Sequence, residues 1–453
     1  DSDEEMITHR FAADKSDAAA KALTAGLDMD MSSFSYLEHL ADALRDGRVT
    51  QAQIDTAVRR VLEAKSRLGL FERPYADPQR ERALILNPAH RAVAREMARS
   101  SIVLLKNEGD LLPIKKSVES IAVIGPLADD RNAPLGTWAV VGQATDVVTV
   151  LAGIKSRAPD GMMIRHVQGC DVDSDRTDGL PAAVEAARQS DLAILVVGES
   201  ADMSGEAHCR TTLDLPGVQQ QLVQAVHETG VPTVVVLLHG RPLSIGWTAE
   251  QVPAILATWH LGVECGPATA DVLFGDFNPG GKLPVTFPRA VGQVPIYYNH
   301  RSTGRPPQAD DRFTSKYIDL PWTPLYPFGF GLSYTKFEFT NLKIEPRELA
   351  TDGAVRISVD IRNAGGRAGT EVVQLYVRDL VAGMTRPVKE LKGFEKVALD
   401  SGEAQSVSFT LKASDLGFYD RDERYVVEPG KFAVWVGPNS AEGLQGEFEL
   451  TAK

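Results

Sequence analysis

The pattern of hydrophobic and polar positions divides the 453-residue chain into three parts. In the first part, apolar side chains recur at helical spacing, as Ile54, Val58 and Leu62 do. A capping-box pair opens the last helix of this part, because Thr50 is followed three residues later by Gln53. The pattern therefore predicts three helices, over residues 17–24, 36–45 and 50–68.

The segments between and after these helices carry turn and strand signals. Gly26 follows the first helix and is expected to end it. The short alternating segment 27–31 (LDMDM) predicts the end of a strand, and the Pro-rich, charged segment 69–88 predicts a linker. Three helices and one strand do not enclose a core, so we expect the chain to begin inside a larger α/β domain.

The middle part alternates continuous apolar runs with amphipathic segments. This alternation predicts an α/β domain with a mostly parallel sheet that is covered on both faces. The strands are expected at residues 121–125, 192–198, 233–238 and 254–258. The helices are expected at residues 89–105, 179–190 and 217–229.

The last part changes to an all-β pattern. Residues 275–334 are rich in Pro and Gly and predict a long irregular connection. From residue 337 onward, period-2 alternation with turn clusters predicts a sandwich of about 110 residues. Its strands are expected at residues 354–362, 371–378, 406–411 and 432–436.

Composition narrows the choice of partners. The net charge of −13 argues against nucleic acid and anionic lipid surfaces as partners, because like charges repel. No apolar run reaches the ~18 residues that span a bilayer. The three cysteines, Cys170, Cys209 and Cys265, lack metal-site spacing, and at most one pair could form a disulfide. We expect no metal and no cofactor.

The segment 204–210 (SGEAHCR) carries the most informative candidate chemistry. It follows the predicted strand 192–198, which places Glu206 at the carboxyl edge of the sheet, where open α/β sheets bind ligands. Gly205 allows the backbone to turn tightly before this carboxylate. Glu199 ends the same strand and is the rival candidate, although carboxylates at strand ends often only accept hydrogen bonds from nearby amides.

Six segments together make the chain resemble glycoside hydrolase family 3, and in particular the C-terminal part of the periplasmic bacterial β-glucosidase kind. Each segment is weakly specific alone, but all of them occur in the expected order. They are residues 100–107 (SSIVLLKN), 122–127 (AVIGPL), 240–242 (GRP), 271–287 (DVLFGDFNPGGKLPVTF), 326–334 (YPFGFGLSY) and 390–394 (ELKGF).

The resemblance implies three domains: the end of a TIM-type barrel, an α/β sandwich with a six-stranded, mostly parallel sheet, and a fibronectin type III-like sandwich. The expected boundaries are 1–75 for the C-terminal barrel units, 76–92 for a linker, 93–300 for the α/β sandwich, 301–336 for a connector and 337–453 for the fibronectin type III-like domain.

The resemblance also implies a retaining, exo-acting β-glucosidase without a cofactor. Such enzymes use two carboxyl groups ~5–5.5 Å apart, one as nucleophile and one as acid and then base. The implied substrate is a small β-linked oligosaccharide or an aryl β-glucoside, in a periplasmic or secreted enzyme, and the resemblance allows a homodimer. A β-xylosidase, a broad-specificity β-glycosidase and a non-catalytic carbohydrate-binding or assembly fragment are the alternatives.

The resemblance assigns the acid/base role to Glu206 and the nucleophile to an Asp on a late barrel strand. Asp1 is the candidate for that nucleophile within this chain, unless the nucleophile lies upstream. Asp3 is a further candidate because Ser2 precedes it, but no apolar strand leads into it. His9 is read as a loop residue beside a helix rather than as a base.

Four further residues are considered for substrate binding. Met31 and Ser32 lie where a barrel strand would end, the position from which βα loops build active sites. Arg210 is expected to orient a carboxylate or a sugar hydroxyl. Trp138 either stacks on a sugar or fills a gap between domains.

Overall fold

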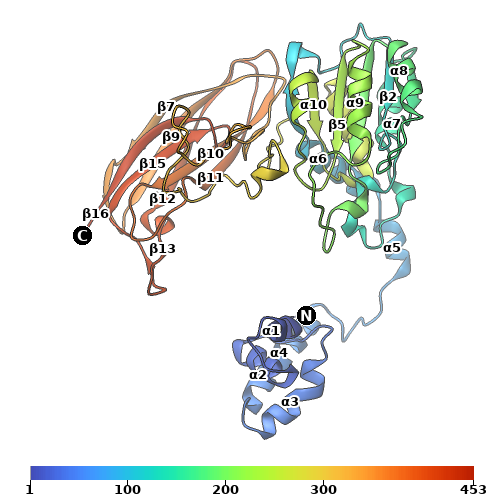
Figure 1. Ribbon diagram of the computed structural model, residues 1–453. Coiled ribbons are helices and arrows are strands. Elements are labelled where there is room, and N and C mark those ends of the chain that lie inside the picture. Colours follow the sequence, from blue (N-terminus) through green and yellow to red (C-terminus); the bar gives the residue numbers. More distant parts are fainter. Residues whose placement is uncertain (1, 453) are drawn as a thin grey trace. The chain divides into compact units, whose positions relative to one another are not determined.

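The computed structural model describes residues 2–452 and divides into two compact units, Asp1–Asn87 and Pro88–Lys453. The described part of the first unit is helical (Figure 1). Its helices are α1 (Ser2–Thr8), α2 (Lys15–Ala25), α3 (Ser35–Arg45), α4 (Gln51–Arg67) and α5 (Pro78–Leu84). The last of these lies inside the segment expected to be a linker.

Local signals in the first unit act as the sequence predicts. The capping box of α4 is confirmed: Gln53 N donates to Thr50 Oγ1 at 3.3 Å, and Thr50 N donates to Gln53 Oε1 at 2.8 Å. Gly26 ends α2 in the left-handed region with φ of 96°. A carboxylate, that of Asp14, caps the start of α2 by accepting from Asp17 N at 2.9 Å.

The strand predicted at residues 27–31 is wrong, because this segment has no regular structure. A strand needs a neighbour that satisfies its backbone groups, and no described residue of the first unit belongs to one. Local hydrogen bonds from side chains take the place of hydrogen bonds to a neighbouring strand. Tyr36 donates its hydroxyl hydrogen to the Leu27 carbonyl at 2.7 Å, and Ser33 donates to Asp30 Oδ1 at 2.7 Å.

The core of the first unit is small. Its cluster of packed, buried apolar side chains consists of Ala20, Leu23, Ala43, Val49 and Ala57. Several large apolar side chains of α4 and its surroundings remain exposed and line a groove, among them Val58, Leu62 and Phe71. This unit therefore presents an apolar surface of the kind that helices bury against a neighbouring layer.

The second unit begins with the α/β sandwich that the sequence predicts. Its sheet has six strands in the order β1-β6-β5-β4-β2-β3, with β1 antiparallel to β6 and all other neighbours parallel. The strands are β1 (Val103–Asn107), β2 (Ser120–Ile124), β3 (Met163–Val167), β4 (Leu192–Gly198), β5 (Thr233–Leu238) and β6 (Ala254–Ala257). The mostly parallel sheet is confirmed.

Helices cover both faces of this sheet (Figure 1). Side chains of α6 (Pro88–Ser101), α7 (Val150–Arg157) and α11 (Cys265–Phe274) pack into the core on one face. Those of α8 (Leu180–Arg188) and α9 (Gln219–His227) pack on the other, and α10 (Gly246–Gln251) precedes β6. Every residue of β4 and β5 is buried, as expected for strands covered on both sides.

The helix expected over residues 89–105 is wrong at its end, since α6 stops at Ser101 and β1 follows at once. Ile102, Val103, Leu104 and Leu105 form a short apolar run; all four are buried, and the last three belong to β1. Periodicity does not distinguish such a run from the continuation of a buried helix. The sequence pattern also missed β3, α7, α10 and α11.

The rest of the second unit is the predicted β-sandwich. One sheet has the order β11-β10-β15-β16-β8 and the other has β12-β9-β7, with a shared apolar core between them. Their bounds are β7 (Phe337–Glu345), β8 (Glu348–Ala350), β9 (Ala354–Asn363), β10 (Gly369–Asp379), β11 (Glu390–Leu399), β12 (Ala404–Lys412), β15 (Gly430–Gly437) and β16 (Leu444–Thr451). A small ribbon of β13 (Phe418–Tyr419) and β14 (Tyr425–Val426) completes it.

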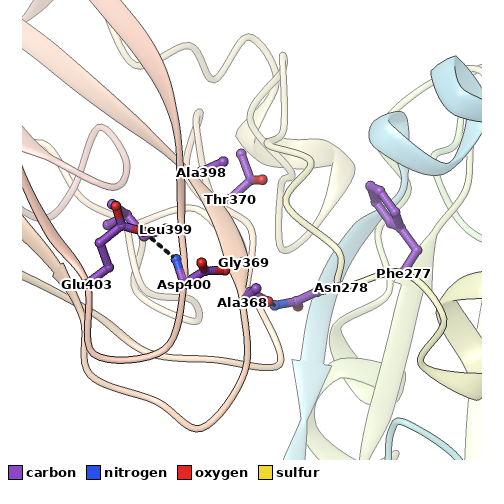
Figure 2. Close-up of a pocket in the computed structure, with 9 residues that line it drawn as sticks. All are labelled: Phe277, Asn278, Ala368, Gly369, Thr370, Ala398, Leu399, Asp400 and Glu403. Atoms are coloured by element: carbon purple, nitrogen blue, oxygen red, sulfur yellow. Dashed lines mark hydrogen bonds between the residues drawn. The ribbon is translucent and has the colours of Figure 1, made fainter.

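Polar contacts join the α/β sandwich to the β-sandwich within this unit. Lys282 Nζ lies 2.6 Å from Glu371 Oε1, and both side chains are largely buried. Asn278 Nδ2 donates to the Ala368 carbonyl at 2.9 Å. A pocket of about 310 Å³ lies beside this bond. Figure 2 shows residues that line it, with Phe277 on one side and Glu403 on the other.

Candidate active site

The loops that follow the strands of the parallel sheet meet at its topological switch point. β3 lies on one side of β2 and β4 lies on the other, so the connections after β2 and β4 diverge at this edge. Ligand sites of open α/β sheets form in such crevices outside the carboxyl ends of the strands. The loop after β4 carries both candidate carboxylates, Glu199 and Glu206.

The Glu199 carboxylate is completely buried, and both of its oxygens have partners. Its Oε1 lies 2.7 Å from Arg210 Nη1 and 2.9 Å from Arg241 Nε, and its Oε2 accepts from Gly240 N at 3.3 Å. Two guanidinium groups and one amide therefore compensate the cost of burying this charge. Through these contacts Glu199 holds the loop in place. Arg210, predicted to orient a carboxylate, pairs with Glu199.

Glu206 has the opposite environment. Its side chain is exposed, and among the described residues it has neither a hydrogen-bond nor an ion-pair partner. Both neighbours have positive φ, 128° at Gly205 and 61° at Ala207, so the backbone turns sharply around it. A Cβ at position 205 would lie 2.7 Å from Thr137 Cγ2, so glycine also allows the loop to approach Thr137.

Side chains from other loops hold the Glu206 loop on both sides of that residue. Arg241 Nη2 donates to the Met203 carbonyl and to the His208 carbonyl, the latter at 2.9 Å. Thr137 Oγ1 lies within hydrogen-bond distance of the Ala201 and Ser204 carbonyls. The backbone on either side of Glu206 is thus fixed while its carboxylate extends into solvent.

His260 supports the same loop from the end of β6. Its Nε2 lies 3.3 Å from Ser204 Oγ, and its Nδ1 donates to the Ala133 carbonyl at 2.6 Å. Burial lowers the pKa of His260, which favours the neutral ring. Gly240 permits this packing, because a Cβ at position 240 would lie 2.0 Å from Ser204 Oγ.

The candidates of the first unit lie on its surface or outside the described residues. Asp1 is outside the described residues, as is the side chain of Asp3. His9 is exposed and lies 3.4 Å from Glu5, an i,i+4 pair that agrees with its reading as a surface residue. Met31 and Ser32 are both exposed, and Ser32 has a φ of 77°.

Trp138 is 68% exposed and therefore does not fill a gap inside the second unit. Its indole is presented by the loop after β2, the loop that also provides Thr137. This exposure is compatible with both roles predicted for Trp138, stacking on a sugar and filling a gap between domains.

The residues that the structure describes contain no group of three or more His, Cys, Asp or Glu side chains placed to hold a metal ion. Cys170 and Cys265 are buried and Cys209 is exposed, and all three are free thiols. Burial raises the pKa of Cys170 to about 11, which keeps that thiol protonated and unreactive.

Three residues that hold the site were missed as functional candidates: Thr137, Arg241 and His260. The segment 240–242 (GRP) attracted attention only as a family motif, and its guanidinium turns out to join Glu199 to the loop. No local signal points to Thr137 or His260, since their partners lie far away in the sequence.

A family model described as the glycosyl hydrolase family 3 C-terminal domain matches residues 102–334, more than half of the chain. The chain belongs to glycosyl hydrolase family 3. A model of the N-terminal domain of family 3 matches residues 2–64, and a fibronectin type III-like domain matches residues 371–440. The resemblance inferred from sequence motifs is thereby confirmed.

Family 3 relatives cover almost the whole of this chain. It is 44% identical to a periplasmic β-glucosidase of Salmonella typhimurium, over 98% of this chain and 62% of that protein. It is 41% identical to a β-xylosidase of Formosa agariphila, with the same two coverages. The chain thus spans about 62% of the length of these relatives.

Solved structures of family 3 agree with the fold. A β-glucosidase from Listeria innocua in complex with laminaribiose matches with a TM-score of 0.91 and 37% identity, over 99% of this chain and 62% of that one. The same enzyme in complex with glucose matches with a TM-score of 0.90 and 38% identity, over 98% and 61%. The predicted order of domains, with a parallel sheet followed by an all-β domain, is confirmed.

Proposed function

We propose that this chain is the C-terminal portion of a retaining, exo-acting β-glucosidase in which Glu206 is the acid/base residue. The observation that carries this proposal is the contrast between the two loop carboxylates. Glu199 is buried and neutralised by two guanidinium groups, whereas Glu206 is exposed on a loop that is fixed on both sides. Only Glu206 is free to reach a substrate.

In this mechanism the α/β sandwich delivers Glu206 to a sugar held by the barrel. Glu206 protonates the glycosidic oxygen while an Asp of the barrel attacks the anomeric carbon and forms a glycosyl-enzyme intermediate. The Glu206 carboxylate then removes a proton from water, which attacks the same carbon and releases the sugar with net retention. Asp1, or an Asp upstream of it, is the proposed nucleophile.

The proposed substrates are small β-linked oligosaccharides of glucose and aryl β-glucosides. The relative from Salmonella typhimurium is named a periplasmic β-glucosidase, and the Listeria innocua enzyme was crystallised with laminaribiose and with glucose. Met31, Ser32 and Trp138 are proposed to line the sugar site. A periplasmic or secreted location is also part of the proposal. No described helix has the length and apolar character needed to cross a membrane.

A β-xylosidase is the second candidate, favoured by the 41% identity to the enzyme of that name from Formosa agariphila. A pentose lacks the hydroxymethyl group of glucose, so the two activities differ in how the pocket accommodates one exocyclic group. Comparing kcat/KM for 4-nitrophenyl β-glucoside and 4-nitrophenyl β-xyloside decides between them, because the preferred substrate gives the larger value.

The acid/base assignment is tested in the full-length enzyme with Glu206→Ala and an aryl β-glucoside whose leaving group is poor. We expect kcat/KM to fall by about 10²–10⁴, the usual contribution of a general acid. Azide should partly restore turnover with an activated substrate by attacking the glycosyl-enzyme, giving a β-glucosyl azide. A drop without any azide product would overturn the assignment of Glu206.

Two controls separate failure of the site from failure of the fold. Glu228→Ala removes a surface carboxylate after α9 and should leave activity unchanged. Thermal unfolding of Glu206→Ala should match the parent within about 0.5 kcal/mol, as for most exposed positions. A full-length enzyme with intact folding and no glycosidase activity at all would support the remaining alternative, a non-catalytic carbohydrate-binding fragment.

A further inference from the structure

A second pocket lies within the second unit, away from the Glu206 loop in the sequence. It has a volume of about 340 Å³ and forms where the irregular connection packs against the β-sandwich. Residues from four separate stretches of chain line it, including Tyr297, Trp322, Thr323, Lys389 and Ser440. The volume is at the lower end of the range typical of small-ligand sites.

Several aromatic side chains line this pocket. Tyr298 stacks on Phe328 with ring centroids 4.4 Å apart, and its hydroxyl oxygen accepts from Leu391 N at 3.2 Å. Tyr297 and Trp322 are 53% and 38% exposed, so parts of both rings remain open to a ligand. Partly exposed rings with a polar end suit the apolar face of a pyranose and its hydroxyl edge.

A lysine without an acidic partner is the distinctive feature of the pocket. Lys389 Nζ donates to the Ser440 carbonyl at 2.6 Å and lies 4.4 Å from the centre of the Trp435 ring. Among the described residues no carboxylate lies within ion-pair distance of Lys389. The nearby acid Glu390 pairs instead with Arg386 at 2.9 Å.

The environment of Lys389 favours an anion as a ligand. Burial lowers the pKa of Lys389 to about 8, so the side chain is still mostly protonated at neutral pH. Its charge faces two aromatic rings, with Nζ 4.4 Å from the centre of Trp435 and 5.7 Å from that of Tyr376, but no described carboxylate. An ammonium group has three donors, and only one of them is used by a described acceptor, Ser440 O. A carboxylate in the pocket would supply both the missing charge and an acceptor.

We propose that this pocket binds the hexuronic acid unit of an acidic saccharide, with its carboxylate on Lys389 and its ring against Tyr297 or Trp322. The lining distinguishes this ligand from two simpler ones. A neutral sugar would bring no anion to the ammonium, while an aryl carboxylate carries no hydroxyl groups for the Thr286 hydroxyl and for His300 Nε2, the ring nitrogen of His300 that does not bond the Arg301 carbonyl. The inference rests on the second unit alone and does not depend on the proposed β-glucosidase activity.

The test measures binding to this chain by isothermal titration calorimetry at pH 7. Methyl β-D-glucuronoside, methyl β-D-glucoside and benzoate serve as the three probes. We expect the glucuronoside to bind with a Kd of about 1 mM, typical of a single weak saccharide unit, and the other two to bind at least about tenfold more weakly. Equal binding of glucoside and glucuronoside, or no binding of glucuronoside up to about 20 mM, would overturn the proposal.

Variants locate the binding in the pocket. Lys389→Gln should weaken glucuronoside binding by at least about tenfold, the value of a charge-assisted hydrogen bond. Lys431→Gln, at an exposed position of β15, is the matched control and should leave the Kd unchanged. Tyr297→Ala removes an exposed ring without disturbing the core, and it keeps the test decisive if Lys389→Gln unfolds.

Two outcomes would contradict the proposal. Glucuronoside binding that survives Tyr297→Ala and Trp322→Ala together would place the ligand elsewhere. Preferred binding of benzoate would replace the hexuronate with an aryl carboxylate.

Discussion

Arg241 holds Glu199 through Nε at 2.9 Å while its Nη2 binds the carbonyls on both sides of Glu206. One guanidinium group therefore joins a buried carboxylate to the loop that presents an exposed one. This arrangement assigns different tasks to the two acids. Glu199 fixes the geometry, and Glu206 is left free for chemistry.

The first prediction concerns Glu199→Gln. The amide has nearly the same shape but no charge, so Arg210 and Arg241 would lose their common counter-charge. Breaking a buried ion pair in this way costs about 3–5 kcal/mol in unfolding free energy. We expect a clear loss of stability in chemical denaturation followed by tryptophan fluorescence.

The contrast with Glu206 makes this prediction specific. Glu206→Gln should leave the denaturation midpoint near that of the parent, because its side chain has no described partner to lose. Azide should not restore activity to Glu199→Gln, since the defect is the position of the loop. The prediction is wrong if Glu199→Gln keeps its stability and behaves like an acid/base variant.

The second prediction concerns the contact between Gly240 and Ser204. A methyl group at position 240 would lie 2.0 Å from Ser204 Oγ and 2.6 Å from Ser204 Cβ, distances at which the loop must move. Gly240→Ala is expected to cost about 1–3 kcal/mol, as overpacking usually does. In the full-length enzyme it should also lower kcat, because the Glu206 loop shifts.

A second substitution tests whether this clash is the cause. Ser204→Gly removes both atoms that the new methyl group would meet, so the double variant should recover most of the lost stability. A double-mutant cycle then gives a favourable coupling between the two positions. Additive losses from Gly240→Ala and Ser204→Gly would show that the damage arises from another contact, such as the one with His260.

Continuous burial made the centre of the α/β domain predictable from the sequence. Strands β4 and β5 lie at the predicted residues, since each is an uninterrupted apolar run between polar turns. The same reasoning failed for residues 102–105, where an apolar run joined directly to a helix is a strand. It also failed for residues 27–31, because a strand depends on neighbours that local alternation does not reveal.

The candidate site was predictable in part for a related reason. A strand end followed by a glycine and a carboxylate points to the Glu206 loop, and local sequence is enough to find it. The side chains that hold this loop come from the ends of other strands, and Thr137, Arg241 and His260 reach it only after the sheet has formed. Which of Glu199 and Glu206 becomes buried also follows from those distant arginines.

The third prediction concerns pH and the buried ring of His239. This side chain is fully buried and contacts the rings of Trp259 and Phe287. Its Nδ1 donates to the Arg241 carbonyl at 2.8 Å. A positive charge on nearby His260 would further disfavour protonation of His239. Burial lowers the pKa of His239 from 6.5 to about 3, so the folded state keeps the ring neutral. The unfolded chain binds a proton below about pH 6.5, and stability must therefore fall as the pH drops from 6.5 toward 3.

His239 alone should remove about 2 kcal/mol of unfolding free energy between pH 7.5 and pH 5, by linkage between its folded and unfolded pKa values. The expected result is that His239→Asn is less stable than the parent at pH 7.5 but loses less stability between those two pH values. Denaturation midpoints measured at both pH values give the comparison. His9→Gln, at an exposed position of the first unit, serves as the control and should keep the parent's pH dependence. If the parent and His239→Asn lose equal stability on acidification, the ring is not held neutral by burial, and the acid sensitivity must come from other groups, with His260 the next to test.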